Sequence, residues 1–179
     1  MVTRRVAIAA LAAIGSVASP QSAPPESASE LPGAKLQGQG RLTFLGLAIY
    51  DLRLWVREGF TAARWDAHEL MLELVYSRTL HGHRIAERSL DEMRRQRAID
   101  APTGARCLEQ MRRLFPDVRH GDRIAGMYRP DGTATFFVNG AARGAVRDGD
   151  FARLFFGIWL SAQTSEPQLR ERLLAGAAP

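Results

Sequence analysis

The sequence has few of the residues and runs that would assign it to a class directly. Its only cysteine is Cys107, so no intramolecular disulfide can form and the fold must be stabilised by packing. Cys107 lies at helical spacing from Met111 and Leu114, which favours a buried thiol over a nucleophile. After the N-terminal segment, no apolar run approaches the roughly 20 residues of a membrane-spanning helix, so no transmembrane segment is expected in the mature chain.

The usual enzyme signatures are also missing. The sequence has no glycine-rich nucleotide loop, no serine elbow and no cysteine placed beside a base. His81 and His83 would share one face of a strand and invite a metal. However, Gly82 interrupts that strand, and no third ligand lies near in sequence. We therefore expect a turn from strand to helix here, and no metal site.

Lysine is nearly absent, since Lys35 is the only one, so the positive charge is carried by arginine. Loss of Arg4 and Arg5 with the N-terminal segment would lower the net charge from +5 to +3. The remaining arginines alternate with Asp and Glu and do not cluster with stacking aromatics. This pattern argues against nucleic-acid binding.

The N-terminus has the organisation of a secretory signal. A positive start, the apolar run 6–17 and small residues at Ser16 and Ala18 predict a signal peptide over residues 1–18, and hence a periplasmic or secreted protein. An uncleaved anchor is the alternative. Residues 19–33, rich in Pro, Ser, Ala and Glu, are predicted to form a disordered linker, which leaves one domain over residues 34–176.

Hydrophobic periodicity in this domain predicts the order βββααβββαα. Residues 36–56 would form two strands or one kinked strand, with glycines at the bends. Tight-turn residues at 129–132 and 139–140 indicate antiparallel hairpins. Helices are expected near 85–93, from a cap at Thr103, after Asp148, and from a cap at Ser165. This order predicts an α+β fold, a large antiparallel sheet carrying a layer of helices.

The segment 70–79 reads as a strand whose apolar side ends in a charge. Strand alternation places Leu72, Leu74, Tyr76 and Arg78 on one side, and the odd-numbered residues from 71 to 79 on the other. A buried guanidinium is costly unless it is compensated. Arg78 therefore needs an internal carboxylate, a route to water or an acidic ligand. Arg53, between Leu52 and Leu54, is expected to face solvent or a cleft.

Four segments in order resemble the secreted bacterial branch of the chalcone isomerase-like family. They are Gly40 to Trp55, Tyr76-Ser77-Arg78, Phe115 to Asp122, and Phe155 to Leu160 followed by Thr164 to Pro167. The resemblance implies an open-faced β-sandwich with an apolar cleft. Catalytic relatives in plants close a chalcone to a flavanone, whereas other relatives bind fatty acids or look like haem binders.

The resemblance also implies that the catalytic donors are missing. The family's strand threonine matches Leu45, its helix tyrosine and asparagine match Ile85 and Glu92, and its arginine falls near Gly33. Loss of one oxyanion donor can slow a reaction by about 10²- to 10³-fold. Isomerase activity is therefore expected to be absent or vestigial.

Two functional hypotheses follow from the residues and the resemblance. In the first, the protein binds a hydrophobic carboxylate, such as a fatty acid or haem, with Arg78 as anchor, Tyr76 as a donor and residues 155–159 in the wall. In the second, it is an isomerase for a phenolic substrate that uses Tyr50, Arg78 or Arg53. A structural protein that presents its aromatic surface to a partner is a third reading. No cofactor is required by any of them.

Overall fold

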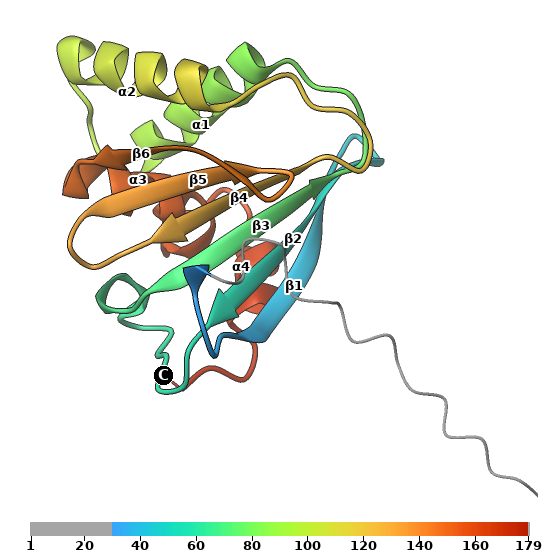
Figure 1. Ribbon diagram of the computed structural model, residues 1–179, viewed down its shortest axis with the longest axis vertical. Helices are drawn as coiled ribbons and strands as arrows, with labels where there is room; N and C mark the ends of the chain where they lie inside the picture. Colours follow the sequence, from blue (N-terminus) through green and yellow to red (C-terminus); the bar gives the residue numbers. More distant parts are fainter. Residues whose placement is uncertain (1–29, 179) are drawn as a thin grey trace, which may run out of the picture.

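The computed structural model describes residues 30–178, which form a six-stranded sheet with helices on one side (Figure 1). The strands lie in sequence order and every neighbouring pair is antiparallel. Their bounds are β1 Lys35–Phe44, β2 Leu47–Val56, β3 Leu70–Tyr76, β4 Arg123–Tyr128, β5 Thr133–Val138 and β6 Ala141–Arg147. The predicted α+β architecture and antiparallel sheet are confirmed.

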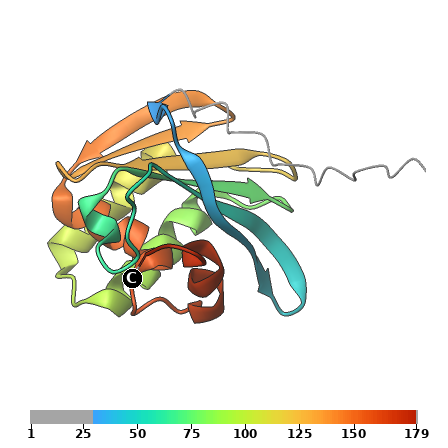
Figure 2. The same cartoon turned by 90° about the horizontal axis from the view of Figure 1, so that it is seen from below.

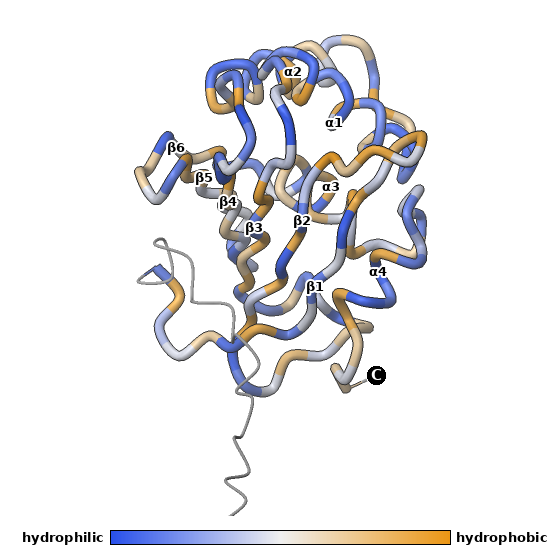
Figure 3. The backbone as a smooth tube through the Cα atoms, turned by 90° about the vertical axis from the view of Figure 1, so that its right-hand side faces the viewer, coloured by the Kyte–Doolittle hydropathy of each residue, from blue (hydrophilic) through white to orange (hydrophobic). Residues whose placement is uncertain are grey.

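The helices gather on one face of the sheet, as Figure 2 shows. They are α1 Gly82–Gln96, α2 Ala101–Leu114, α3 Gly149–Leu160 and α4 Pro167–Leu174, with a short 3-10 helix η2 at Trp65–Ala67. Helix α3 contacts both α1 and α4, and α4 packs beside β1. Figure 3 shows hydrophobic and hydrophilic colours alternating along α4 at this contact, because its leucines face inward and its arginines face outward.

The two faces of the sheet carry different cores, as the alternation in residues 70–76 predicts. Leu70, Leu72 and Leu74 pack with the helices in the main core, to which α3 contributes most of its side chains. Met71, on the opposite face, joins a small second cluster that includes Trp55. Helices thus cover the face towards which the even-numbered residues of β3 point.

Residues 35–56 form a hairpin, which confirms the two-strand alternative. The chain turns at Leu45-Gly46, where both residues have positive φ values of 50° and 77°. Register shifts occur after Leu36 and after Leu42. Gly38 has a further role, because an added Cβ would collide with backbone atoms of Arg172 and Leu173. The glycine therefore lets α4 approach β1 closely.

The helix ends confirm some predicted caps and correct others. Asp148 caps α3 as expected, accepting from the Phe151 N–H at 3.1 Å. The cap of α2 is Asp100, whose side chain accepts from the Thr103 N–H at 2.7 Å, so the prediction of Thr103 was wrong. Glu166, and not Ser165, occupies the N-cap position of α4. In each corrected case the helix begins at a different residue from the one that local patterns indicate.

The folded region begins earlier than predicted. The linker was expected to extend to Gly33, but Leu31 is 1% exposed and belongs to the second cluster on the outer face of the sheet. The predicted signal peptide and most of the predicted linker lie outside the described residues. Among residues 30–178, no helix is both long enough and apolar enough to cross a membrane.

Candidate functional site

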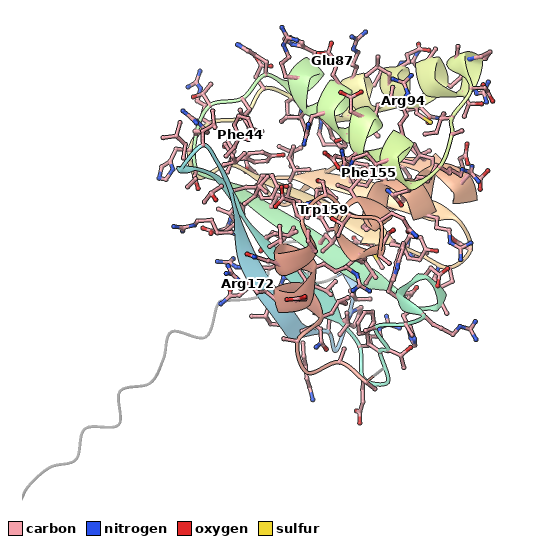
Figure 4. All side chains as sticks on the ribbon, turned by 180° about the vertical axis from the view of Figure 1, so that it is seen from behind. Phe44, Glu87, Arg94, Phe155, Trp159 and Arg172 are labelled. Carbon is pink, nitrogen blue, oxygen red and sulfur yellow. The ribbon has the colours of Figure 1, made fainter. Side chains whose placement is uncertain are left out.

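A cavity of about 370 Å³ lies between the helix-covered face of the sheet and helices α1 and α3. Its wall is mostly apolar, and the sheet and helices contribute to it jointly. The wall includes Leu72, Leu74, Ile85, Phe136, Phe155 and Ile158. Figure 4 shows Phe155 and Trp159 on α3, directed into the space between this helix, the sheet and α1. The predicted contribution of Leu72, Leu74 and the α3 aromatics to one wall agrees with this geometry.

The α3 aromatics divide into lining and support. Phe155 lines the cavity and makes an edge contact with Trp159, at a centroid separation of 5.6 Å. Phe156 is fully buried, packs on Tyr128 and does not line the cavity. Gly157 admits the side chain of Gln96, which binds the Leu154 carbonyl at 2.7 Å and so fixes α1 against α3. The side of α3 that faces away from the cavity is therefore held by packing and by this hydrogen bond.

Tyr50 and Tyr76 are paired across β2 and β3 and both line the cavity. Their rings meet edge to face at 5.9 Å. The Trp159 indole N–H donates to the Tyr50 hydroxyl oxygen at 3.0 Å. In the described chain, the Tyr76 hydroxyl has no hydrogen-bond partner and the Tyr50 hydroxyl donates to no protein group. The site thus holds two hydroxyl protons that are available to a ligand.

Burial sets the protonation state of these tyrosines. Desolvation raises the pKa of Tyr76 far above its ordinary value, and the nearby Tyr50 adds to the rise. Desolvation likewise raises the pKa of Tyr50, outweighing the Trp159 hydrogen bond that lowers it. Both side chains are neutral phenols at any physiological pH, and they act as donors rather than as bases.

Charged side chains from α1 complete the lining. Glu92 has a side chain only 7% exposed, and its carboxylate pairs with the Arg88 guanidinium at 2.5 Å. Arg95 lies 3.7 Å from the same carboxylate. Arg88 is 71% exposed, so this pair spans the cavity wall and the solvent. Its position gives the cavity a polar end with a cation at the surface.

The structure corrects the predicted position of Arg78. Strand β3 ends at Tyr76, and Arg78 lies beyond it, exposed, and does not line the cavity. The Ser77 N–H still bonds to the Ile49 carbonyl of β2 at 2.9 Å, and beyond Ser77 the chain turns towards α1, which begins at Gly82. Arg78 was predicted to need an internal carboxylate, a route to water or an acidic ligand, and in the structure its side chain reaches water.

Arg53 lies on the opposite face of the sheet, away from the cavity. Its guanidinium pairs with Glu73 at 3.2 Å, and the Glu73 side chain is 1% exposed. Arg53 therefore neutralises a buried carboxylate beneath the second core cluster. Of the four predicted ligand-binding residues, the fold brings Tyr50 and Tyr76 to the cavity and leaves Arg53 and Arg78 outside it.

His81, Gly82 and His83 form the predicted turn from strand to helix. Gly82 is the first residue of α1, and its N–H donates to the Asp117 carboxylate at 2.8 Å. The rings of His81 and His83 stack at 5.6 Å, and His81 lies 3.2 Å from Asp117. Across residues 30–178, no group of three metal-ligating side chains occurs.

Sequence patterns had not singled out several lining residues. Arg88 and Glu92 looked like part of a solvated helix face, although their i,i+4 spacing marks an ion pair. Thr43 and Phe44 from the end of β1 and Glu166 from the loop before α4 also line the cavity. No local signal marks these residues, because their roles depend on contacts with distant elements.

The comparisons with known proteins agree with this fold. The sequence model described as chalcone isomerase-like matches residues 21–175. No curated protein sequence matches the chain. A crystal structure of a fatty-acid binding protein from Arabidopsis thaliana is similar, with a TM-score of 0.62, 13% identity, and coverage of 80% of this chain and 87% of that one. The family match covers most of the sequence and confirms the resemblance: the chain belongs to the chalcone isomerase-like family.

Proposed function

We propose that this protein is a non-catalytic binding protein for an apolar molecule with an acidic head group, of the fatty-acid class. The observation that carries the proposal is the cavity of about 370 Å³, which has an apolar wall and two unengaged tyrosine protons. Its volume falls within the range of about 300 to 1,000 Å³ typical of small-molecule sites. The similar fold of a plant fatty-acid binding protein supports the same class of ligand.

The polar end of the cavity suits a carboxylate. The hydroxyls of Tyr50 and Tyr76 can each donate to a carboxylate oxygen, and hydrogen bonds to a charged acceptor are stronger than neutral ones. Arg88 lies at the same end and can share its charge between Glu92 and the ligand. The acyl chain would then lie against Leu72, Leu74 and the α3 aromatics. In this arrangement Arg88 replaces Arg78 as the cation nearest the head group.

The alternative, an isomerase for a phenolic substrate, finds less support in the residues. Leu45, at the position of the family's threonine, is 86% exposed at a hairpin tip and does not line the cavity. Ile85 lines it but offers no polar atom, and Glu92 is held by Arg88. The neutral tyrosines could stabilise an oxyanion but could not remove a substrate proton. Binding therefore explains the lining better than turnover does.

Haem fits the lining less well than a fatty acid does. Haem iron is usually held by His, Cys, Met or Tyr. The cavity wall contains no His, Cys or Met within the described residues, and desolvation raises the pKa of Tyr50 and of Tyr76, which disfavours the phenolate that would bind iron. Haem is therefore left out of the proposal. The predicted signal peptide supports a periplasmic or secreted location for the binding step.

Titration with a long-chain fatty acid, followed by calorimetry or displacement of a fluorescent analogue, tests the proposal. Ile85→Trp should fill the cavity from α1 and abolish binding, since a tryptophan there occupies the ligand's volume. Leu108→Trp is the matched control, because Leu108 is half-buried on α2 and does not line the cavity. Equal binding by both variants, or no binding by the wild-type chain, would refute the proposal.

A further inference from the structure

We propose that the β1–β2 hairpin tip docks this protein onto an anionic lipid bilayer and brings the cavity mouth to the lipid surface. The apolar tip consists of Phe44, Leu45 and Leu47. Docking itself stands on the surface described below, whereas ligand exchange at the bilayer rests on the proposed function. The bilayer is identified by its chemistry, an apolar interior beneath a layer of phosphates.

The apolar tip gathers the exposed large apolar side chains of the described chain. Phe44, Leu45 and Leu47 are 66%, 86% and 53% exposed, and among residues 30–178 they are the only large apolar side chains classed as exposed. They are contiguous at the end of a hairpin that projects beyond the rest of the sheet (Figure 1). Exposed apolar groups gathered in one place mark an interaction surface.

The backbone at the tip gives an independent reason to single out Leu45. Its φ of 50° lies in the left-handed region, which is unfavourable for leucine and favourable for Asn or Gly. The side chain makes no compensating burial, being 86% exposed. Strain at an exposed apolar residue points to a use for its side chain outside the chain.

The tip also adjoins the cavity mouth. Thr43 and Phe44 line the cavity, as do Leu42 and Ile49 on the two strands that lead away from the tip. A molecule leaving the cavity along this hairpin therefore passes from the apolar wall to the apolar tip without crossing a charged surface of the hairpin. An acyl chain held in a bilayer could enter by the same path.

Two loops at the same end of the molecule supply positive charge. The Ser77 N–H bonds to the Ile49 carbonyl at 2.9 Å, which places Arg78 beside the hairpin. Leu80 and Val118 pair through two backbone hydrogen bonds of 3.0 and 2.9 Å, which brings Arg119 to the same end. Arg78 and Arg119 are both exposed, and neither joins any salt bridge found within residues 30–178.

Two acidic residues in these loops, Asp117 and Asp122, are held by neighbouring groups. Asp117 accepts from Gly82 and pairs with His81, and Asp122 accepts from the Arg119 N–H and from Asn139. Arg84 and Arg88, on the α1 side of the cavity mouth, are 73% and 71% exposed although each pairs with a glutamate. The rim thus presents arginines to solvent around an apolar point.

A bilayer fits these features better than a protein partner does. A stable protein interface buries about 800 Å² on each partner, which three side chains on one turn cannot supply. A bilayer requires no shaped counterpart, takes up apolar side chains at its interface, and attracts arginines by about 1 kcal/mol each.

Co-sedimentation of the full-length chain with phosphatidylglycerol vesicles, compared with phosphatidylcholine vesicles, tests the proposal. The wild-type chain should bind the anionic vesicles more tightly, and salt should weaken that binding. Leu45→Asn with Leu47→Thr should bind at least about tenfold more weakly, since burial of one leucine is worth that factor or more. Neither residue lines the cavity, so fatty-acid binding in solution should not change.

The charged residues need a matched comparison. Arg78→Gln and Arg119→Gln should each weaken binding to anionic vesicles about fivefold. Arg147→Gln removes the same charge from an exposed residue at the opposite end of the sheet, and it should leave binding unchanged because salt screens distant charges.

Three outcomes would overturn docking. The wild-type chain could bind both kinds of vesicle equally, or the double variant at Leu45 and Leu47 could bind vesicles as tightly as the wild type. The third is self-association of the wild-type chain in solution that the double variant abolishes. Fatty-acid binding without vesicle binding would refute docking and leave the proposed function standing. Vesicle binding without fatty-acid binding would do the reverse.

Discussion

Two tight turns at the same end of the sheet share a backbone geometry and differ in chemistry. Leu45-Gly46 joins β1 to β2 with φ values of 50° and 77°, and Asn139-Gly140 joins β5 to β6 with values of 49° and 81°. Both are two-residue hairpin loops with positive φ at the two central positions, a geometry for which Asn-Gly is the preferred sequence. One turn has the preferred residue and the other has a leucine.

The contacts of the two turns explain the difference. The Asn139 side-chain oxygen Oδ1 accepts from the Arg123 N–H at 2.8 Å, and the side-chain amide Nδ2 donates to the Asp122 carboxylate at 3.1 Å. Leu45 has no comparable partner and is 86% exposed. The β5–β6 turn therefore stabilises the start of β4, whereas the β1–β2 turn presents a side chain to the surroundings. A turn with Asn-Gly can join two strands without strain. We therefore infer that the leucine in the β1–β2 turn is present for a function other than folding.

Exchanging the residue at the stable turn should have the largest effect on folding. Asn139→Leu removes two hydrogen bonds worth about 0.5 to 1.5 kcal/mol each and places leucine in the left-handed region, which costs about 1 to 2 kcal/mol. We expect the free energy of unfolding to fall by about 2 to 5 kcal/mol. Urea denaturation measures it, and a change below about 0.5 kcal/mol would show that the two turns are energetically alike.

Removing the hydroxyl of Tyr50 or of Tyr76, which line the cavity next to the β1–β2 hairpin, should weaken ligand binding. Tyr50→Phe and Tyr76→Phe keep the rings and each delete one donor to a carboxylate, a bond worth roughly 1.5 to 3 kcal/mol when the acceptor is charged. Fatty-acid affinity should fall about tenfold or more in each variant. Tyr128→Phe is the control, since its hydroxyl bonds to the Asp66 carbonyl and does not line the cavity. An equal loss in the control would remove the tyrosines from the head-group site.

The fold was largely predictable, because it follows from local patterns. Alternation in residues 70–76 and turn residues at 139–140 fix strand faces and hairpin positions without distant information. Arg78 shows where this stops. The alternating pattern continues past Tyr76, but the last ladder bonds run from the Tyr76 N–H to the Asp122 carbonyl and from the Ser77 N–H to the Ile49 carbonyl, and the backbone leaves the sheet after them. Where β3 ends depends on where its distant partner β4 begins, at Arg123, and this leaves no trace in the local sequence.

The site was predictable only where a side chain lies on a strand. Tyr76 was identified because strand alternation directs it to the core face, whereas Tyr50 was named only as a substitute for the missing family donors; both line the cavity. The resemblance matched Glu92 to a site position of the family, but its burial was not predicted, because a glutamate among arginines on α1 reads as a solvated residue. It is buried because α3 packs across α1, a contact made through Gly157 and Gln96. Burial of a helix face depends on which partner covers it, and that partner lies about 60 residues away.

The apolar turn should become more stable when it is given the residue of the other turn. Leu45→Asn relieves the left-handed strain of leucine and loses no buried contact, so we expect the free energy of unfolding to rise by about 0.5 to 1 kcal/mol. Gly46→Ala is the opposing control and should destabilise the chain, because alanine is strained at a φ of 77°. If Leu45→Asn is instead destabilising, the leucine contributes to the fold and the contrast between the turns disappears.

The smallest expected effect is on how the stability of the Asn139-Gly140 turn depends on pH in acid. Hydrogen bonds from the Arg119 N–H, first, and from the Asn139 amide hold the pKa of Asp122 below its ordinary value of about 3.9. A lowered pKa means that the carboxylate's contribution to stability is complete above the ordinary pKa and is lost as the pH falls through the folded value. In Asn139→Ala the pKa of Asp122 should therefore rise, and the stability gap to the wild type should narrow below about pH 4. Titration of carboxyl signals by NMR measures the shift.

Asp131 serves as the internal reference, because its pKa is lowered by Thr133 at the other end of β5 and should not move. Equal pKa shifts at Asp122 and Asp131 would mean that the variant perturbs the whole sheet. The hydrogen bond from Asn139 would then have no specific effect on Asp122.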